Sequence, residues 1–512
     1  MEKIVNIKCV CPKMMFKSVL LVLLISLLFM CATACAESPD GGTVDTDDTV
    51  AAAVLDDLTA ADSEDEEIAV DIMTLVPEQD LGGFEMRFLT DRIWDWDFGP
   101  FHMMYIEELT GEPVYDAIYR RNAIVEERLN IRISEVVSTN NQAKDTIRRL
   151  ISAGDDEFDV VIAESWNIGA QLAANGLLVN LKDVGLQLDA PWWDQASIRD
   201  YAIGDRLYFM TGDHNLISDD ATWVLFFNKQ MTLDLGLELP YGLVREGRWT
   251  FDAQMEYMRM AKQDLTGDPV WTYEDIWGQV THTQHYTGLL IAAGENLITR
   301  DSDGLPVFGQ VSDRFHRVYE KIQEMMKTPG YTHNIHVPIP RAPGHRHATY
   351  NFLANSALFC PEILAHTRRF RQMENDFGIL PHPKFDEHQE RYYSYVLGQV
   401  TVTTIPITNS NIDYTAIVLD ALGMLSSHTT IPAYYEVSLV GKFFRDDDSG
   451  EMLDIIRANR VFGTGDAWGW GGVTGAFQGA ARDAQPMTSF IERQERVITR
   501  AIERTLEAFF LR

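Results

Sequence analysis

Cysteine is scarce in this sequence, and its few copies gather at the N-terminal end. Of the five cysteines in 512 residues, four lie within the first 35 residues and only Cys360 lies beyond them. A single cysteine cannot form an internal disulfide, so the chain after residue 35 must be held together by its core. A segment of roughly 430 residues buries enough apolar surface on folding to do this.

Positive charge is also scarce. The chain has 43 Lys and Arg against 76 Asp and Glu, and its formal net charge is −33 at pH 7. Residues 36–80 alone contain fifteen acidic side chains and no basic one. Because such a surface repels phosphate backbones, nucleic acid is not expected as a partner.

The sequence signatures of common enzymes are missing. There is no Gly-x-Ser-x-Gly, no His-Glu-x-x-His and no phosphate-binding loop, and no cofactor is expected. A chain without a phosphate-binding loop that took part in active import would need separate membrane and ATPase subunits. A retaining glycosidase needs only two carboxyl groups about 5–5.5 Å apart, and so many acids leave that alternative open.

The first 35 residues predict a lipoprotein signal peptide. Four lysines precede an apolar run, Val19–Met30, which only Ser26 interrupts. The run is shorter than the roughly 20 residues of a membrane span, and small residues suited to a peptidase follow it. Ala32-Thr33-Ala34-Cys35 resembles the bacterial lipobox, although Ala32 stands where Leu is usual. Cys35 is therefore the predicted lipidation site, and ordinary signal-peptide cleavage is the main alternative.

Residues 36–80 predict an acidic, disordered linker. Their low hydrophobicity and their self-repulsion prevent them from burying a core and favour an extended chain. Next to a lipid-bearing cysteine, such a segment would hold a folded body away from a membrane.

The pattern changes to that of a folded α/β domain after the linker. Residues 84–88 alternate as a strand, and residues 115–130 carry an apolar face typical of a helix. A second strand follows at residues 131–133, a helix near residues 147–151 ends at Gly154, and "FDVVIA" is typical of a buried parallel strand. This βαβαβ unit predicts an open sheet that binds ligands at the carboxyl ends of its strands.

Several segments, in order, resemble a known family. They include "DAIYRRNAIVEERLNIRI", "FDVVIAESWNIGAQLAANGLLVNLKDV", "PWWDQ", "ALFCPEILAHTRRF" and "GQVTVTTIP". Together they span roughly Phe84 to Arg512 and resemble the extracellular solute-binding proteins of ABC importers, in the carbohydrate-associated group that includes maltose-binding protein.

The resemblance implies an α/β, two-lobed periplasmic-binding-protein-like fold of type II. Each lobe would be a parallel or mixed sheet flanked by helices, and a hinge would join the lobes. By analogy, residues 84–220 plus 357–400 form lobe 1, and residues 221–356 plus 401–512 form lobe 2. The hinge crossings are expected near residues 220–223, 355–357 and 403.

The resemblance also implies a function. The protein would be a monomeric extracellular lipoprotein on the outer face of the cytoplasmic membrane, without enzyme activity. It would capture a solute, a sugar or oligosaccharide, and deliver it to ABC permease subunits. A secreted glycoside-active enzyme and a ligand-presenting sensor for a signalling receptor are the alternatives.

A sugar-binding cleft needs polar groups for hydroxyls at the ring edge and flat aromatic rings for the C–H faces. The tryptophans of the glycine-rich "DAWGWGG" loop are the preferred stacking residues, and the resemblance places residues 284–286 where relatives contact ligand. The predicted ligand-binding residues are Asp91, Trp94, Trp96, Glu164, Trp166, Asn167, Asp213, Asp220, Gln284, His285, Tyr286, Glu362, Trp468 and Trp470.

No metal site is predicted. The histidines at 333, 336, 345 and 347 lie close in sequence, but their spacing matches no metal motif, so a surface loop with several prolines is expected. Asp264 and Asp268 stand where relatives often carry a longer loop resembling a calcium site, and here they predict a turn.

Overall fold

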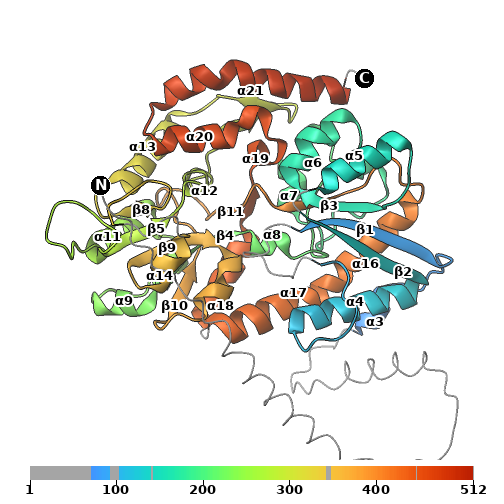
Figure 1. Cartoon of the computed structure of the whole chain (residues 1–512), viewed down its shortest axis with the longest axis horizontal. Helices are drawn as coiled ribbons and strands as arrows, with labels where there is room; N and C mark the ends of the chain where they lie inside the picture. Colours follow the sequence, from blue (N-terminus) through green and yellow to red (C-terminus); the bar gives the residue numbers. More distant parts are fainter. Residues whose placement is uncertain (1–70, 93–102, 140–141, 342–346, 445–446, 511–512) are drawn as a thin grey trace, which may run out of the picture. The chain divides into compact units, whose positions relative to one another are not determined.

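A computed structural model describes residues 71–92, 103–139, 142–341, 347–444 and 447–510, all within one compact unit that begins at Ala69 (Figure 1). The predicted signal peptide with Cys35 and most of the predicted linker lie outside the described residues, as do Trp94, Trp96 and His345. Among the helices of the described segments, none is long and apolar enough to cross a membrane.

The first sheet has four strands in the order β12-β3-β1-β2. The strand β1 pairs in parallel with β2 and β3, and β12 pairs antiparallel to β3. Figure 1 shows α5 and α6 on one side of this sheet and α4 and α16 on the other. These elements are β1 (Phe84–Arg92), β2 (Ile131–Thr139), β3 (Val160–Glu164), β12 (Thr401–Thr404), α4 (Pro113–Leu129), α5 (Ala143–Ala153), α6 (Ser165–Gln171) and α16 (Ile412–His428).

The ends of α4 follow from its sequence. It begins at Pro113. Proline suits this position because it has no N–H group, and an N–H group in the first turn would have no intrahelical acceptor. The Glu112 side chain accepts the N–H groups of Val114 and Tyr115. It ends at Leu129, and its C-cap Asn130 adopts a left-handed φ of 46°. The predicted apolar face, with Ile118 and Val125, is buried.

The second sheet has five strands in the order β10-β4-β9-β5-β8. The strands β5, β8 and β9 are parallel to one another, and β4 is antiparallel to both β9 and β10. The carboxyl ends of β5, β8, β9 and β10 therefore meet at one edge, where β4 begins. The strands are β4 (Trp223–Asn228), β5 (Trp277–Thr281), β8 (Thr332–Asn334), β9 (Ala357–Ile363) and β10 (Phe377–Leu380).

Two strand pairs and further helices complete the described residues. The strand β6 (Ile298–Arg300) pairs with β7 (Pro306–Phe308), and β11 (Ser394–Val396) pairs with β13 (Arg460–Phe462). The remaining helical segments are α3 (Ile72–Leu75), η1 (Ala173–Asn175), η2 (Leu181–Asp183), α7 (Gln195–Tyr201), α8 (Ile217–Asp220), α9 (Lys229–Asp234), α10 (Tyr241–Arg245), α11 (Phe251–Ala261), α12 (His285–Ala292), α13 (Asp313–Lys327), α14 (Ala348–Leu353), η3 (Leu364–His366), α15 (Thr367–Phe370), α17 (Thr430–Pro432), η4 (Ala433–Phe444), α18 (Asp447–Ala458), α19 (Thr464–Trp468), η5 (Trp470–Gly472), α20 (Val473–Arg482) and α21 (Met487–Phe510).

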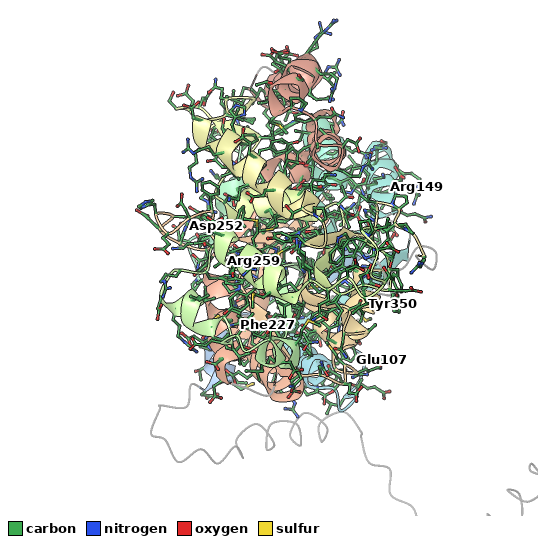
Figure 2. The ribbon with its side chains drawn as sticks, turned by 90° about the vertical axis from the view of Figure 1, so that its left-hand side faces the viewer. Glu107, Arg149, Phe227, Asp252, Arg259 and Tyr350 are labelled. Carbon is green, nitrogen blue, oxygen red and sulfur yellow. The ribbon has the colours of Figure 1, made fainter. Side chains whose placement is uncertain are left out.

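The helix α11 shows how the helices cover the second sheet. Its N-cap is Thr250, whose hydroxyl accepts the Ala253 N–H. Asp252 and Arg259, labelled in Figure 2, are exposed on its outer side, whereas Met258 is buried against the sheet. The apolar stripe of the sequence therefore forms the inner face of the helix.

Part of the predicted lobe assignment is wrong. Residues 357–400 were assigned to lobe 1, but β9 and β10 pair with β4 in the second sheet. The segment at 401–404 is β12 in the first sheet, and α16 packs against α4. A predicted crossing at 355–357 is therefore excluded, and the chain returns to the first sheet between β10 and β12. An apolar run such as "ALFCP" indicates a buried strand without indicating which sheet it joins.

The end of the predicted disordered linker is ordered. Residues 72–75 form α3, and Val76 is buried in the core. The Arg128 guanidinium donates to the Val76 carbonyl oxygen at 2.9 Å and pairs with Glu78 at 2.7 Å. The acidic composition of the segment hid the few apolar residues among 72–76 that pack against the folded domain.

Candidate ligand-binding site

Two adjoining cavities lie where the two sheets approach each other. The first, which we call the tryptophan cavity, has a volume of about 320 Å³, and the second, the histidine cavity, has about 350 Å³. Both are lined by Gln284, Leu397 and Gln399, so they are neighbours. The polar and aromatic lining of the tryptophan cavity includes Trp166, Gln284, Tyr395, Gln399, Asp466, Thr474 and Gln478.

Trp166 reaches the tryptophan cavity from the first sheet. It follows the end of β3, and its indole N–H donates to Glu164 Oε2 at 2.6 Å. The buried Asn167 donates to the same oxygen at 3.1 Å, and the Lys144 ammonium lies 5.7 Å from the centre of the Trp166 ring. The side chain of Trp166 remains 40 % exposed. Of these predicted residues, Trp166 offers an aromatic surface, whereas Glu164 and Asn167 hold it in place.

The opposite wall of the tryptophan cavity supplies hydroxyl, carboxylate and amide groups. The Tyr395 hydroxyl donates to Asp466 Oδ2 at 2.6 Å and accepts the Gly398 N–H at 3.0 Å. Burial raises the pKa values of both the Asp466 carboxyl and the Tyr395 hydroxyl. The Gln478 amide donates to Thr287 Oγ1 at 3.1 Å. Sequence reasoning missed Asp466 because it preferred the tryptophans of the same "DAWGWGG" segment, and no local pattern singled out Tyr395 or Gln478.

Glycine brings the β11–β12 connection close to α19. A Cβ atom on Gly398 would lie 2.1 Å from Asp466 Cβ, and one on Gly463 would lie 2.2 Å from Asp466 Oδ2. Both distances are far below van der Waals contact. The position of Asp466 in the cavity wall therefore depends on the missing side chains at 398 and 463.

The histidine cavity lies at the edge of the second sheet where β5, β8 and β9 end. Glu362, near the end of β9, is buried and lies 3.2 Å from His282 Nε2, which follows β5. His347 Nδ1 lies 3.6 Å from Glu362 Oε1, and His366 Nε2 lies 3.6 Å from Glu362 Oε2. His336, after β8, also lines the cavity. Parallel pairing therefore gathers side chains that are far apart in sequence.

Burial and charge set the protonation of this group. Burial raises the pKa of Glu362, but the surrounding His282, His366 and His347 lower it more, so the net shift is downward. Burial lowers the pKa of His366 to about 3 and also lowers that of His347, despite the neighbouring carboxylate. Glu362 thus favours protonated imidazoles around it, whereas burial favours neutral ones, and for His347 and His366 burial has the larger effect.

Only the first residue of the predicted trio Gln284–Tyr286 lines the cavities. His285 and Tyr286 are buried, and the His285 ring stacks on Trp223 at 5.8 Å with an interplanar angle of 3°. Burial lowers the pKa of His285 well below its usual value. Because α12 begins at His285, successive side chains diverge around its axis, and two of the three turn into the core.

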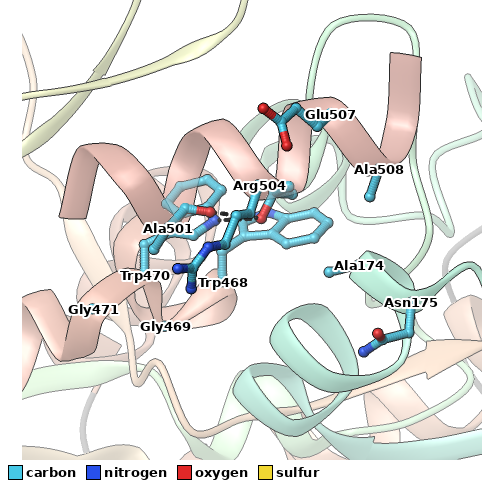
Figure 3. A pocket seen from close by; sticks show the side chains of 11 residues that line it. Ala174, Asn175, Trp468, Gly469, Trp470, Gly471, Ala501, Arg504, Glu507 and Ala508 are labelled. Carbon is cyan, nitrogen blue, oxygen red and sulfur yellow. Dashed lines mark hydrogen bonds between the residues drawn. The ribbon is translucent and has the colours of Figure 1, made fainter. Parts of the chain in front are cut away.

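Trp468 and Trp470 are packed side chains. Their exposed fractions are 1 % and 3 %, and their rings stack 5.7 Å apart. Both indole N–H groups have protein acceptors, the Tyr201 carbonyl at 3.3 Å and Thr505 Oγ1 at 3.0 Å. They do lie at the wall of a separate cavity of about 660 Å³ beside α21 (Figure 3). With so little ring surface exposed, this geometry favours packing over sugar stacking.

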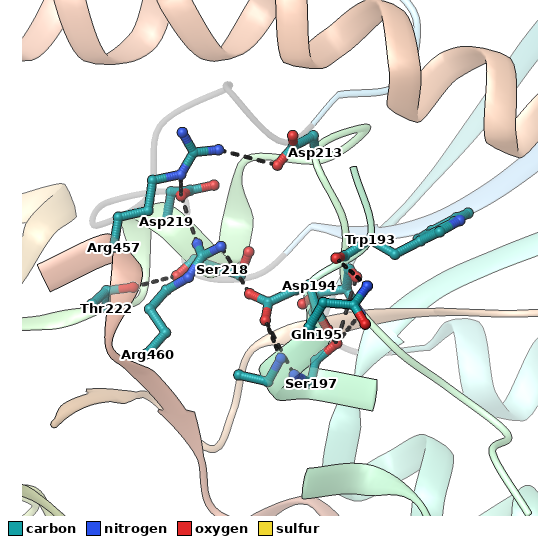
Figure 4. Close-up of polar contacts among 12 residues, drawn as sticks. Trp193, Asp194, Gln195, Ser197, Asp213, Ser218, Asp219, Thr222, Arg457 and Arg460 are labelled. Carbon is teal, nitrogen blue, oxygen red and sulfur yellow. Dashed lines mark hydrogen bonds and ion pairs between the residues drawn. The ribbon is translucent and has the colours of Figure 1, made fainter. Parts of the chain in front are cut away.

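The predicted aspartates near the hinge belong to an ion-pair network (Figure 4). Arg460 joins Asp219, at 2.6 Å, to Asp194, at 2.8 Å, and Arg457 pairs with Asp213 at 3.3 Å. In the same region Asp220 is buried and pairs with Arg368 at 2.9 Å, and it accepts the Tyr434 hydroxyl at 2.6 Å. This network lies where the chain crosses from β3 to β4, so Asp213 and Asp220 support that crossing.

Asp91 is also a structural carboxylate. It is buried at the end of β1, and its Oδ1 accepts the Ala143 N–H at 3.0 Å, at the first residue of α5. Burial raises the pKa of Asp91. Neither cavity described above has Asp91 in its lining.

The predicted surface loop of histidines is only partly correct. His336 is exposed, but His333 is buried and hydrogen-bonded to Asn351 at 3.0 Å, and His347 faces Glu362. The spacing of histidines within the segment could not reveal the contacts of His347, because its partners Glu362 and His366 come from β9 and η3. Asp264 and Asp268 do cap backbone N–H groups of their own bend, as expected for a turn.

Solved structures with the same fold are sugar-binding proteins. The sugar-binding protein MalE from Xanthomonas citri aligns with a TM-score of 0.55 and 11 % identity over 83 % of this chain and 98 % of its own. A sugar transporter from Rhizobium etli aligns at 0.53, with 13 % identity over 82 % and 99 %. This chain has the fold of a solute-binding protein. The predicted two-lobed α/β fold class is confirmed.

A third structure with this fold contains a bound sugar. The ABC substrate-binding protein from Listeria monocytogenes, in complex with cycloalternan, aligns at a TM-score of 0.50 with 10 % identity over 83 % of this chain and 99 % of its own. Neither a protein-family model nor a curated protein matches this chain.

Proposed function

We propose that this chain is an extracellular receptor that captures a sugar or oligosaccharide in the tryptophan cavity. The observation that carries the proposal is the pairing of an exposed indole, Trp166, with the polar side chains of Tyr395, Gln399, Asp466 and Gln478 around one space. Sugar C–H faces suit the indole, and sugar hydroxyls suit the polar groups. The fold supports this proposal because the aligned proteins bind sugars.

Capture would proceed by hinge closure. Trp166 follows a strand of the first sheet, whereas Gln284 follows a strand of the second, and both line the tryptophan cavity. A ligand that contacts both residues would bind more tightly to the closed state, in which the two residues are near each other. It would therefore stabilise the closed state. The Asp–Arg network at the β3–β4 crossing would fix the pivot.

The carboxylates near the cavities contact neighbouring side chains, and this favours ligand binding over glycoside hydrolysis. Asp466 bonds with Tyr395, Glu164 accepts the Trp166 indole, and Glu362 contacts His282. Each carboxylate thus positions a neighbouring side chain of the cleft. This arrangement suits a receptor that presents a fixed surface.

Delivery would require ABC permease subunits as partners, and the Cys35 lipid would keep the receptor on the outer face of the membrane. A multiply acylated cysteine suits this role because a single acyl chain binds membranes only marginally. The anchor has its own test: Cys35→Ala should release protein into the medium, and equal release from the parent and the variant would rule the anchor out.

The function is tested by a thermal-shift screen of the full chain, treated with EDTA, against mono- and oligosaccharides. A ligand present at 100 times its dissociation constant should add about 2.7 kcal/mol to the free energy of unfolding. Each sample is then analysed for hydrolysed sugar. A shift with intact sugar supports the receptor, a shift with cleaved sugar indicates a glycosidase, and no shift with any saccharide contradicts sugar capture.

A further inference from the structure

We propose that His347, Glu362 and His366 bind one Zn²⁺ ion at the wall of the histidine cavity. This site goes beyond sugar capture, and it does not require the proposed function to be correct. The three residues form a group whose ligand atoms all lie within 4.8 Å of one another. Two imidazoles and one carboxylate are a donor set that zinc uses in proteins.

The fold holds the three ligands on separate, rigid elements. Glu362 lies in β9, His366 ends η3 four residues later, and His347 is the N-cap of α14. The His347 and His366 rings lie side by side, with centroids 4.7 Å apart and an interplanar angle of 20°. Glu362 and His366 are buried and His347 is half-buried, so water does not surround the group.

The separations suit a metal better than direct hydrogen bonds. Both imidazole nitrogens lie 3.6 Å from a Glu362 oxygen, which is too long for a hydrogen bond. Ligand atoms at about 2.0–2.1 Å from a tetrahedral zinc ion are about 3.3–3.4 Å apart. The two nitrogens approach different oxygens of Glu362, and the ligand atoms lie within 4.8 Å of one another, so the side chains must move closer together around an ion.

Neighbouring residues contact two of the ligands. The Thr349 N–H donates to His347 Nδ1 at 3.4 Å, a long hydrogen bond that a zinc ion at this nitrogen would replace. His282 Nδ1 lies 2.5 Å from Gln284 Oε1, and His282 Nε2 lies 3.2 Å from Glu362 Oε1, so this ring contacts the carboxylate from outside the group. Such outer contacts orient metal ligands.

The cavity gives the ion an accessible fourth position. His347, Glu362 and His366 all line the same space of about 350 Å³, which adjoins the tryptophan cavity through Gln284 and Gln399. Three protein ligands beside an open space are typical of zinc sites that keep one position for water or a bound molecule. A donor atom of a captured solute could take that position.

The test is a titration of the purified full chain, stripped with EDTA and dialysed, with ZnCl₂ alone. We expect one Zn²⁺ per chain with micromolar or tighter affinity. His347→Gln and His366→Gln should each weaken binding at least tenfold. His333→Gln is the matched control, because it removes a buried histidine from the same sheet but outside the group, and it should leave the affinity unchanged.

The wild-type chain provides a second measurement that does not depend on the folding of any variant. X-ray absorption of the zinc-loaded chain should show histidine nitrogens and oxygen at about 2.0–2.1 Å with low coordination number. No uptake, equal affinity in all variants, or a shell without histidine would each overturn the site. Because the titration contains no sugar and the sugar screen contains no zinc, either proposal can fail alone.

Discussion

Trp166 owes its position in the tryptophan cavity to a single hydrogen bond with Glu164 and to the Lys144 ammonium over its ring. We expect Trp166→Ala to weaken oligosaccharide binding about tenfold, or about 1.4 kcal/mol, because the variant loses the flat surface for sugar C–H groups. Isothermal titration calorimetry with a saccharide from the screen measures this change.

Trp271 provides the matched control for that substitution. It too has a lysine ammonium, from Lys262, 5.7 Å from its ring centre, and it lines neither of the two adjoining cavities. Trp271→Ala should bind the saccharide as the parent does. Equal loss of affinity in both variants would mean that Trp166 acts through general stability and not through contact.

Trp468 should behave in the opposite way to Trp166. Its indole is buried between Phe209 and Trp470, so Trp468→Ala should lower the free energy of unfolding by about 3–5 kcal/mol. Urea unfolding followed by circular dichroism measures the change. An unchanged stability together with abolished sugar binding would restore the stacking role that the sequence suggested.

Residue types in a loop could be recognised from the sequence, but their directions could not. Gln284, Glu362 and Trp166 were predicted and do line the cavities, whereas Trp468 turns inward to meet Tyr201. Trp166 lies at the start of α6 and Trp468 lies at the end of α19, and both have glycine or polar residues nearby in sequence. Which one is exposed depends on packing between distant segments.

At the scale of elements, the β11–β12 connection depends on close backbone approach. Gly398→Ala should lower the free energy of unfolding by roughly 1–3 kcal/mol, because its new Cβ would meet Asp466 at 2.1 Å. The control is Gly479→Ala in α20, where a Cβ meets nothing within 4 Å, and its stability should not fall. Thermal unfolding of both variants checks this, and equal stabilities would contradict the close contact.

The individual elements were largely predictable, and their assembly was less so. The βαβαβ unit and the start of α11 follow from local periodicity and capping. Membership of β9 in the second sheet depends on pairing with β4 and β5, which no local pattern specifies.

At the scale of the whole molecule, buried histidines should make the protein acid-sensitive. Burial lowers the pKa of His214 to about 3, and those of His333 and His382 to about 4, against about 6.5 in an unfolded chain. Below pH 6.5 the unfolded state therefore binds protons that the folded state does not. Each histidine should remove about 1.4 kcal/mol of stability between pH 7.5 and pH 5.5.

Buried carboxylates act in the opposite direction, because burial raises the pKa values of Asp91, Glu126, Glu135 and Asp466 as well as that of Asp213. Burial raises the pKa of Asp213 to about 6, so its protonation on acidification favours the folded state. The pKa values of His285, His347 and His366 are lowered too, so we expect the histidines to outweigh the carboxylates, and the unfolding midpoint in EDTA should be lower at pH 5.5 than at pH 7.5. A midpoint that stays constant or rises would show that these histidines are protonated in the folded protein.

The central claim is that one sugar bridges both sheets at the tryptophan cavity. Hydrogen–deuterium exchange of the full chain, with and without a saccharide from the screen, tests it most directly. The account predicts protection of residues 164–169 after β3 together with residues 282–284 and 395–399. Protection confined to residues 174–175 and 501–508, beside the separate cavity at Trp468, would contradict it, as would no protection at any of these segments.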